Sequence, residues 1–187
     1  MSGNQLVRGC APTLAGIKTA NLFSAKCDSI NEAETVVREW NRQLGPKGVC
    51  AKILQFDGKR ALIFVFRVSH LTSDLRREEV QKYLGELGYN TYNLSHCISH
   101  LSGRIRNEGE FPHEIGLFLG YPVDDVKAFI KNKGKGFKCS GLWKVYSNEE
   151  EAIKIFEKYR KCTRIYCMKF QEGFSLGRLT VAGNGLQ

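Results

Sequence analysis

The fold of this chain is decided by one stretch, Val49-Cys-Ala-Lys-Ile-Leu-Gln-Phe-Asp-Gly-Lys-Arg-Ala-Leu-Ile-Phe-Val-Phe-Arg-Val68. It holds two apolar runs joined by Asp57-Gly58, and glycine tolerates the positive φ angle that a tight hairpin turn requires. The run from Ala61 to Phe66 is almost continuously apolar, so we expect that strand to be buried on both faces. The stretch therefore predicts a hairpin of strands over 49–56 and 60–68.

Patterns on either side of the hairpin predict more helices than strands. Two capping boxes, Ser29-x-x-Glu32 and Ser147-x-x-Glu150, mark helix starts because each pairs a small polar residue with a glutamate three positions later. Apolar spacing and breakers then give helices over 29–44, 75–87, 93–106, 112–119, 122–132 and 148–159, and further strands over 17–26, 137–146 and 162–170.

Composition suits a single globular domain over residues 1–187. Hydrophobic residues make up 42% of the chain and charged residues 25%, which excludes disordered, collagen-like and fibrous proteins. The predicted fold class is α/β (or α+β), a mixed sheet of about five strands with helices packed on it. Residues 173–187 are expected to form an irregular C-terminal tail.

The chain is basic, with a formal net charge of +9 at pH 7. This balance favours anionic partners, although solubility alone would also account for it. Six lysines and no acidic residue lie between Val126 and Asn148. A nucleic-acid-binding module that uses the Lys-rich segment 127–144 is therefore an alternative function, with affinity that falls as salt rises.

The predicted helices over 112–119 and 122–132 have the spacing of a helix-turn-helix. Gly116 and Val126 lie on either side of the turn glycine, where two helices would pack on each other. Asp124 and Asp125 would open the second helix, and carboxylates there repel a duplex. Simple helix packing is the stronger interpretation of this pair.

The cysteines predict reduced thiols in the cytoplasm. Their spacing contains no C-x-x-C, so zinc-ribbon and thioredoxin motifs are absent. No apolar run suits a signal peptide or a membrane span, so we expect no membrane partner. His96 and His100 share a helix face, which leaves a metal or redox protein as a second alternative, with a third ligand from His113, Cys139 or Cys167. We assign no metal ligand and no cofactor, and the oligomeric state stays open.

Three short stretches carry functional side chains. The first places a thiol, a hydroxyl and an amine (Cys10, Thr13 and Lys18) in an expected loop that could cradle an anion or merely cover the sheet. His113-Glu114 could exchange a proton with a substrate, or simply begin a helix. Trp143 to Tyr146 alternates aromatic residues on an expected strand, as in a platform for a planar group or as in a core.

Several of these stretches resemble one family. They are Cys10-Ala-Pro-Thr-Leu-Ala-Gly-Ile-Lys-Thr-Ala-Asn-Leu-Phe-Ser24, the run from Phe111 to Val126, Gly141-Leu-Trp-Lys-Val-Tyr146, Cys162 to Tyr166 and Gly173 to Val181. Nearly the whole chain is similar to the domain-of-unknown-function family 3793, whose members come mostly from anaerobic bacteria. The resemblance implies a cytoplasmic bacterial protein and transfers no catalytic roles. Its motifs fall on Cys10, Thr13, Lys18, Asn21, His113, Glu114, Tyr121, Trp143 and Lys144.

Together these observations predict a protein that binds a small anionic or planar ligand. We expect the pocket where the Cys10–Asn21 segment, the Arg67 end of a strand and the His113–Glu114 turn meet. The expected catalytic residues, if a reaction occurs, are His113 with Glu114 for proton transfer and Cys10 as nucleophile. The expected binding residues are Thr13, Lys18, Asn21, Arg67, Tyr121, Trp143 and Lys144.

Overall fold

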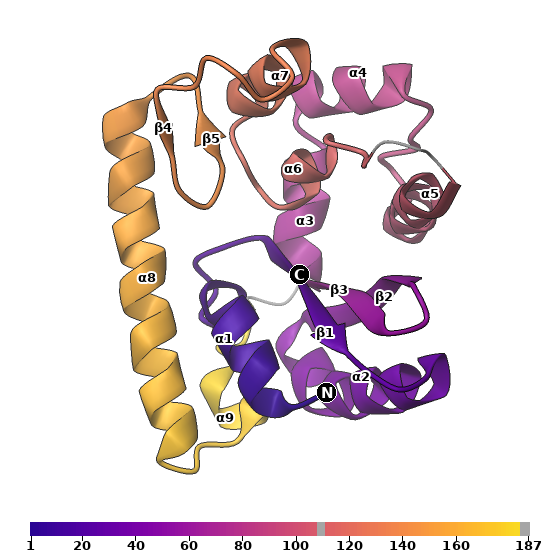
Figure 1. Cartoon of the computed structure of the whole chain (residues 1–187), viewed down its shortest axis with the longest axis vertical. Coiled ribbons are helices and arrows are strands. Elements are labelled where there is room, and N and C mark those ends of the chain that lie inside the picture. The colour runs from indigo at the N-terminus through magenta and orange to yellow at the C-terminus, as the bar shows by residue number, and fades with distance from the viewer. Residues whose placement is uncertain (108–110, 184–187) are drawn as a thin grey trace. The chain divides into compact units, whose positions relative to one another are not determined.

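Strand β3 (Arg60–Arg67) is the middle strand of a three-stranded antiparallel sheet (Figure 1). The computed structural model describes residues 1–107 and 111–183. β1 (Ala20–Lys26) pairs with one side of β3, and β2 (Val49–Phe56) pairs with the other. Six of the seven positions after Arg60 are buried, so the expectation that this strand is covered on both faces is confirmed.

The turn between β2 and β3 has the chemistry that its two residues predict. The Asp57 carboxylate accepts hydrogen bonds from the backbone N–H groups of Lys59 and Arg60, at 2.9 and 2.7 Å. Gly58 has a φ of 93°, a conformation that other residues rarely adopt. The predicted hairpin is therefore confirmed, including the bounds of its first strand.

One face of this sheet packs on helices α1 (Gly3–Leu14), α2 (Ile30–Leu44) and α9 (Leu176–Leu179). α2 begins where the capping box predicts, because the Ser29 hydroxyl accepts a hydrogen bond from the Glu32 backbone N–H at 3.1 Å. The shared core consists of apolar side chains from all of these elements, among them Leu6, Val7, Leu14, Ala33, Trp40, Leu44, Ala61, Ile63, Val65, Leu176 and Leu179. This first compact unit comprises Met1–Leu71 and the chain from Lys161 onward.

A second compact unit comprises Thr72–Arg160. It contains α4 (Glu78–Glu86), α5 (Leu94–Asn107), α6 (Ile115–Phe118) and α7 (Val123–Lys131), and a short hairpin of β4 (Cys139–Ser140) and β5 (Lys144–Val145). Helices α3 (Val68–Leu75) and α8 (Glu149–Gln171) contain residues of both units, and the short 3-10 turn η1 (Gly45–Lys47) follows α2 in the first. No helix within the described ranges is both long enough and apolar enough to cross a membrane.

The mixed helix-and-sheet class is confirmed, but the expected single sheet of about five strands is wrong. The strands form one sheet of three and one of two. Residues 162–170 belong to α8, since no Gly or Pro interrupts the chain from Glu149 to Gln171 and acidic residues in its first turn suit the helix dipole. Residues 137–146 form a hairpin instead of one strand, because the Gly141 N–H donates to the Trp143 carbonyl in a tight turn.

Three other expectations change at helix ends. The expected loop at the N-terminus is helical as far as Leu14, since α1 begins with a complete capping box at Ser2. At the start of α8, the side chain that accepts a hydrogen bond from a helix N–H group is that of Asn148 and not that of the predicted Ser147. The Glu151 N–H donates to Asn148, and the Ser147 N–H donates to Asp125. The expected irregular tail contains the one-turn helix α9.

The predicted packing of Gly116 against Val126 is confirmed. A Cβ atom at Gly116 would lie 2.7 Å from Val126 Cγ2 and 3.2 Å from the Tyr121 ring, so only glycine fits where α6 meets α7. The helix pair thus has a packing role of the kind expected. Asp124 is exposed at the start of α7, and Asp125 is buried.

Replacing Gly116 with alanine should lower the free energy of unfolding. Inserting a methyl group into a packed contact costs about 1–3 kcal/mol. The matched control is Gly103→Ala in the interior of α5, where no atom lies within 4 Å of the new Cβ. That change should stabilise the protein by roughly 0.5–1 kcal/mol, because alanine loses less backbone freedom on folding. Urea unfolding of both variants measures the difference, and equal effects would contradict the packing argument.

Candidate functional site

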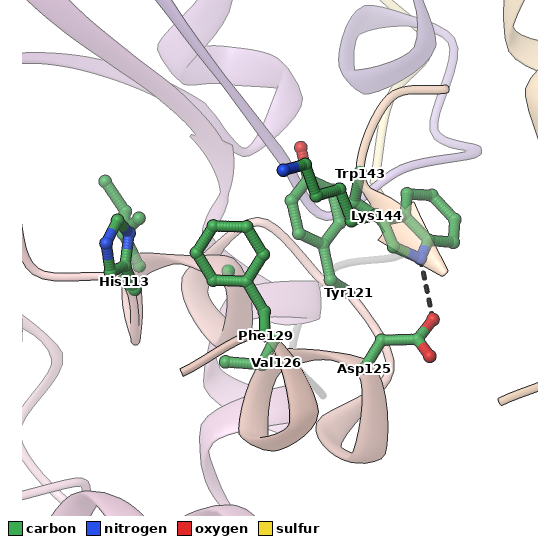
Figure 2. A pocket seen from close by; sticks show the side chains of 9 residues that line it. His113, Tyr121, Asp125, Val126, Phe129, Trp143 and Lys144 are labelled. Atoms are coloured by element: carbon green, nitrogen blue, oxygen red, sulfur yellow. Dashed lines mark hydrogen bonds between the residues drawn. The ribbon is translucent and has the colours of Figure 1, made fainter. Parts of the chain in front are cut away.

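A pocket in the second unit brings together four of the predicted site residues, His113, Tyr121, Trp143 and Lys144 (Figure 2). They come from three places in the chain: the turn before α6, the turn between α6 and α7, and the β4–β5 hairpin. The pocket has a volume of about 170 Å³, and its remaining lining is Ile115, Gly116, Asp125, Val126 and Phe129. A mostly aromatic and aliphatic lining with a few polar groups is typical of a small-molecule site.

The Trp143 indole forms one wall of the pocket. Its ring stacks on Tyr121 with centroids 4.9 Å apart and planes inclined by 28°, and it meets the edge of Phe156 at 4.6 Å. The Tyr121 hydroxyl donates to the Leu142 carbonyl at 3.2 Å. Burial raises the pKa of Tyr121 to about 12, so this phenol stays protonated at neutral pH.

The Asp125 carboxylate fixes that wall from α7. Its Oδ2 accepts a hydrogen bond from Trp143 Nε1 at 2.8 Å, which Figure 2 shows as a dashed line. Its Oδ1 accepts from the backbone N–H groups of Tyr146 and Ser147, both at 2.8 Å. The side chain lies in the first turn of α7, where the helix dipole favours a negative charge. Both oxygens are therefore engaged within the protein.

The Lys144 ammonium lies between two aromatic rings and a backbone carbonyl. Nζ is 4.8 Å from the centre of the Phe137 ring and 5.6 Å from that of Phe129. It donates to the Gly134 carbonyl at 2.7 Å. An ammonium has three N–H donors, so this contact leaves donors that an anionic ligand could use.

His113 and Glu114 separate in space, although they are adjacent in sequence. The exposed His113 imidazole lines the pocket and meets the Phe129 ring at a centroid distance of 4.8 Å. Glu114 is buried and accepts a hydrogen bond from the Tyr89 hydroxyl at 2.9 Å. Its Oε1 also lies 2.6 Å from Arg104 Nε. Glu114 thus joins α6 to α5, and only His113 reaches the pocket.

The other predicted site residues all lie in the first unit, around the C-terminal end of α1. Arg67 is buried, and Nε donates to the Thr13 carbonyl while Nη2 donates to those of Leu14 and Val181, each at 2.7 Å. Burial lowers the pKa of this guanidinium. Arg67 therefore caps the last carbonyls of α1, where a cation also suits the helix dipole.

The remaining residues of this group have internal partners as well. The Thr13 hydroxyl donates to Asn21 Oδ1 at 2.7 Å, and the buried Lys18 ammonium donates to the Ala20 carbonyl. Cys10 is fully buried in the core, and burial raises the pKa of its thiol. A protonated, enclosed thiol is a poor nucleophile. The expected pocket drew on both units, whereas the pocket described above consists of second-unit residues alone.

The histidines and cysteines form no metal site in the part of the chain that the structure describes. No group of three or more His, Cys, Asp or Glu side chains there could hold a metal ion. The rings of His96 and His100 are 6.4 Å apart, and His100 lies 4.4 Å from the Tyr89 ring. All seven cysteines are free thiols.

Sequence reasoning missed Asp125 and Phe129 as pocket residues. Asp125 lies three residues after Pro122, at a predicted helix start. An exposed aspartate that repels DNA would have the same position in the sequence. Phe129 lies one helical turn after Asp125, on the same face of α7. The i, i+4 spacing places Asp125 and Phe129 on one face of the predicted helix. It indicates a pocket only when the position of Trp143 in the hairpin is also known.

Replacing Arg67 with methionine should destabilise the first unit. Two buried carbonyl groups and one partly buried carbonyl group would lose a charged donor. Such hydrogen bonds contribute about 1.5–3 kcal/mol each, so we expect a loss of roughly 3 kcal/mol or more. The control is Arg60→Met at the exposed start of the same strand, which loses only exposed hydrogen bonds to Ser24 and should unfold close to wild type. Urea unfolding measures both. A wild-type midpoint for Arg67→Met would refute the capping role.

Replacing Asp125 with asparagine should release the Trp143 wall. An amide cannot accept all three hydrogen bonds, so the Trp143 indole should lose its acceptor and become more exposed to water. The chain has two tryptophans, and Trp40→Phe leaves Trp143 as the one that emits. In this background the Trp143 emission should shift to longer wavelength. The free energy of unfolding should fall by about 1–3 kcal/mol. Asp124→Asn removes the same charge from the same helical turn and should leave the spectrum unchanged. Identical spectra for the two variants would contradict the positioning of Trp143 by Asp125.

Comparison with known proteins concerns almost the entire chain. A family model described as "Protein of unknown function (DUF3793)" matches residues 6–180, a range that includes every residue lining the pocket. No curated protein and no solved structure matches the chain. The match confirms the resemblance inferred from the sequence motifs. The chain belongs to the DUF3793 family.

Proposed function

We propose that this DUF3793 protein binds a small planar ligand with a negative charge in the pocket of the second unit. The observation that carries the proposal is the aromatic pocket with the Lys144 ammonium at its wall and its one carboxylate, Asp125, already engaged. Four positions of the family motifs line this pocket, which a purely structural role for those motifs does not require.

The walls favour a flat ligand. Tyr121, Phe129, Trp143 and His113 present rings to one small space, and stacked or edge-on aromatic contacts contribute about 0.5–1.5 kcal/mol beyond the area they bury. The pocket volume of about 170 Å³ is below the ~300–1,000 Å³ of sites that enclose a drug-sized molecule. A single ring system therefore matches the space better than a long flexible chain.

The charges favour an anion. Asp125 is only 2% exposed, and three N–H donors surround its oxygens, so it offers a cation little. Lys144 is half-buried between aromatic rings, where a charge interacts more strongly than in open water. A carboxylate or phosphate oxygen could take one of its remaining donors. His113 at the rim could add a hydrogen bond to the same ligand.

Hydrogen bonds within the protein hold two of the pocket side chains in place. Asp125 orients the indole, and the Gly134 carbonyl orients the ammonium. Gly134 itself has a φ of 72°, and a Cβ there would lie 3.1 Å from Phe129 and 3.2 Å from Lys144 Nζ. A prearranged site loses less conformational entropy on binding, which supports a binding role.

Binding of 2-naphthoate and its neutral analogue 2-naphthamide tests the proposal. In the Trp40→Phe background, Trp143 fluorescence should respond to naphthoate at lower concentration than to naphthamide. Lys144→Met should weaken naphthoate binding about tenfold, the equivalent of one charged hydrogen bond, and should leave naphthamide binding nearly unchanged.

The control for that experiment is Lys154→Met, which removes an exposed lysine of α8 outside the pocket lining. It should leave both affinities at the value of the parent protein. The proposal is refuted if neither compound changes Trp143 fluorescence, or if the acid and the amide bind equally well.

A further inference from the structure

The end of α7 and the loop that follows it form a basic stretch next to the pocket. Lys131, the last residue of α7, and the loop residues Lys133 and Lys135 have exposed side chains. Within residues 1–107 and 111–183, none of the three forms an ion pair. No acidic residue occurs between Val126 and Asn148 to offset them.

The backbone of this loop contacts the pocket residues directly. Gly134, between Lys133 and Lys135, accepts the hydrogen bond from Lys144 and packs against the Phe129 ring. Lys133 has a φ of 50° and Gly134 one of 72°, so the chain turns sharply at the pocket wall. The backbone of two lysines is therefore adjacent to the carbonyl that holds the pocket ammonium.

A ligand with one carboxylate would pair with Lys144 and would not contact Lys133 or Lys135. Several negative charges on one flexible arm would use them together, and phosphate groups are the usual partners of clustered lysines. The pocket has room for a ring system, so the arm of a larger ligand must lie outside at the rim. A ring in an aromatic pocket joined to phosphates on a basic loop is the chemistry of a nucleotide.

We infer that the ligand class is a nucleoside polyphosphate, with its base in the pocket, its first phosphate at Lys144 and its further phosphates on Lys133 and Lys135. This inference rests on the proposed function, since it uses the same pocket. Stacking of the base on aromatic side chains supplies sequence-tolerant attraction. The lysines supply a charge attraction that grows with the number of phosphates and weakens as salt screens it.

The experiment compares adenosine, AMP and ADP by Trp143 fluorescence in the Trp40→Phe background. Affinity should rise about tenfold from adenosine to ADP at low salt, and most of that gain should disappear at high salt. The double variant Lys133→Ala/Lys135→Ala should lose the part of this gain that separates ADP from AMP, and it should keep the affinity for adenosine within about twofold.

The matched control removes two exposed lysines of α8, Lys154→Ala/Lys158→Ala, which changes the net charge equally. It should retain the gain from the phosphates. The nucleotide inference fails if adenosine and ADP bind with equal affinity. It also fails if the control double variant and the loop double variant have the same affinity for ADP. The proposed function would still stand if 2-naphthoate binds, and both would fail if no planar compound alters Trp143 fluorescence.

A single-stranded oligonucleotide provides a further arm of this test. If it binds the wild-type protein far more tightly than ADP does, and the loop variants lose that binding, the occupant is a nucleic acid and the nucleotide inference is overturned. The inference is supported if the protein binds ADP at least as tightly as it binds the oligonucleotide, with both affinities expressed per binding site.

Discussion

The buried Asp125 carboxylate is the interaction on which the pocket depends. It connects the first turn of α7 to the β4–β5 hairpin and to the residues that lead into α8. A buried charge is costly unless it is fully hydrogen-bonded, and three donors with the α7 dipole meet that requirement. Because one of the donors is the Trp143 indole, satisfying the charge also fixes the orientation of an aromatic wall. Structure and site geometry therefore have the same physical origin.

The first unit also contains a buried charge at a helix end, but this charge is positive. Arg67 is a buried cation at the C-terminal end of α1, and the carbonyls there carry the negative end of a helix dipole. It also holds the carbonyl of Val181, so one side chain joins β3, α1 and the segment after α9. Each unit thus contains a buried charge at the helix end where the dipole favours it.

This symmetry separates the motif residues into two classes. The class with internal partners includes Thr13 and Lys18 of the first unit and Glu114 of the second. The other class, which includes Trp143 and Lys144, lines the pocket of the second unit. Membership of a family motif therefore does not by itself place a polar side chain in the pocket.

Features of the fold that depend on neighbouring residues follow from the local sequence. The Asp57–Gly58 hairpin, the Ser29 start of α2, the contact of Gly116 with Val126 and membership of the family could all be predicted, because turn chemistry, capping and short-range packing act over a few residues. Only the tertiary structure shows that Glu114 turns to Arg104 and that Asp125 reaches Trp143, 18 residues away. The partner of a buried charge is chosen by distant segments that fold against it, and no local pattern records that choice.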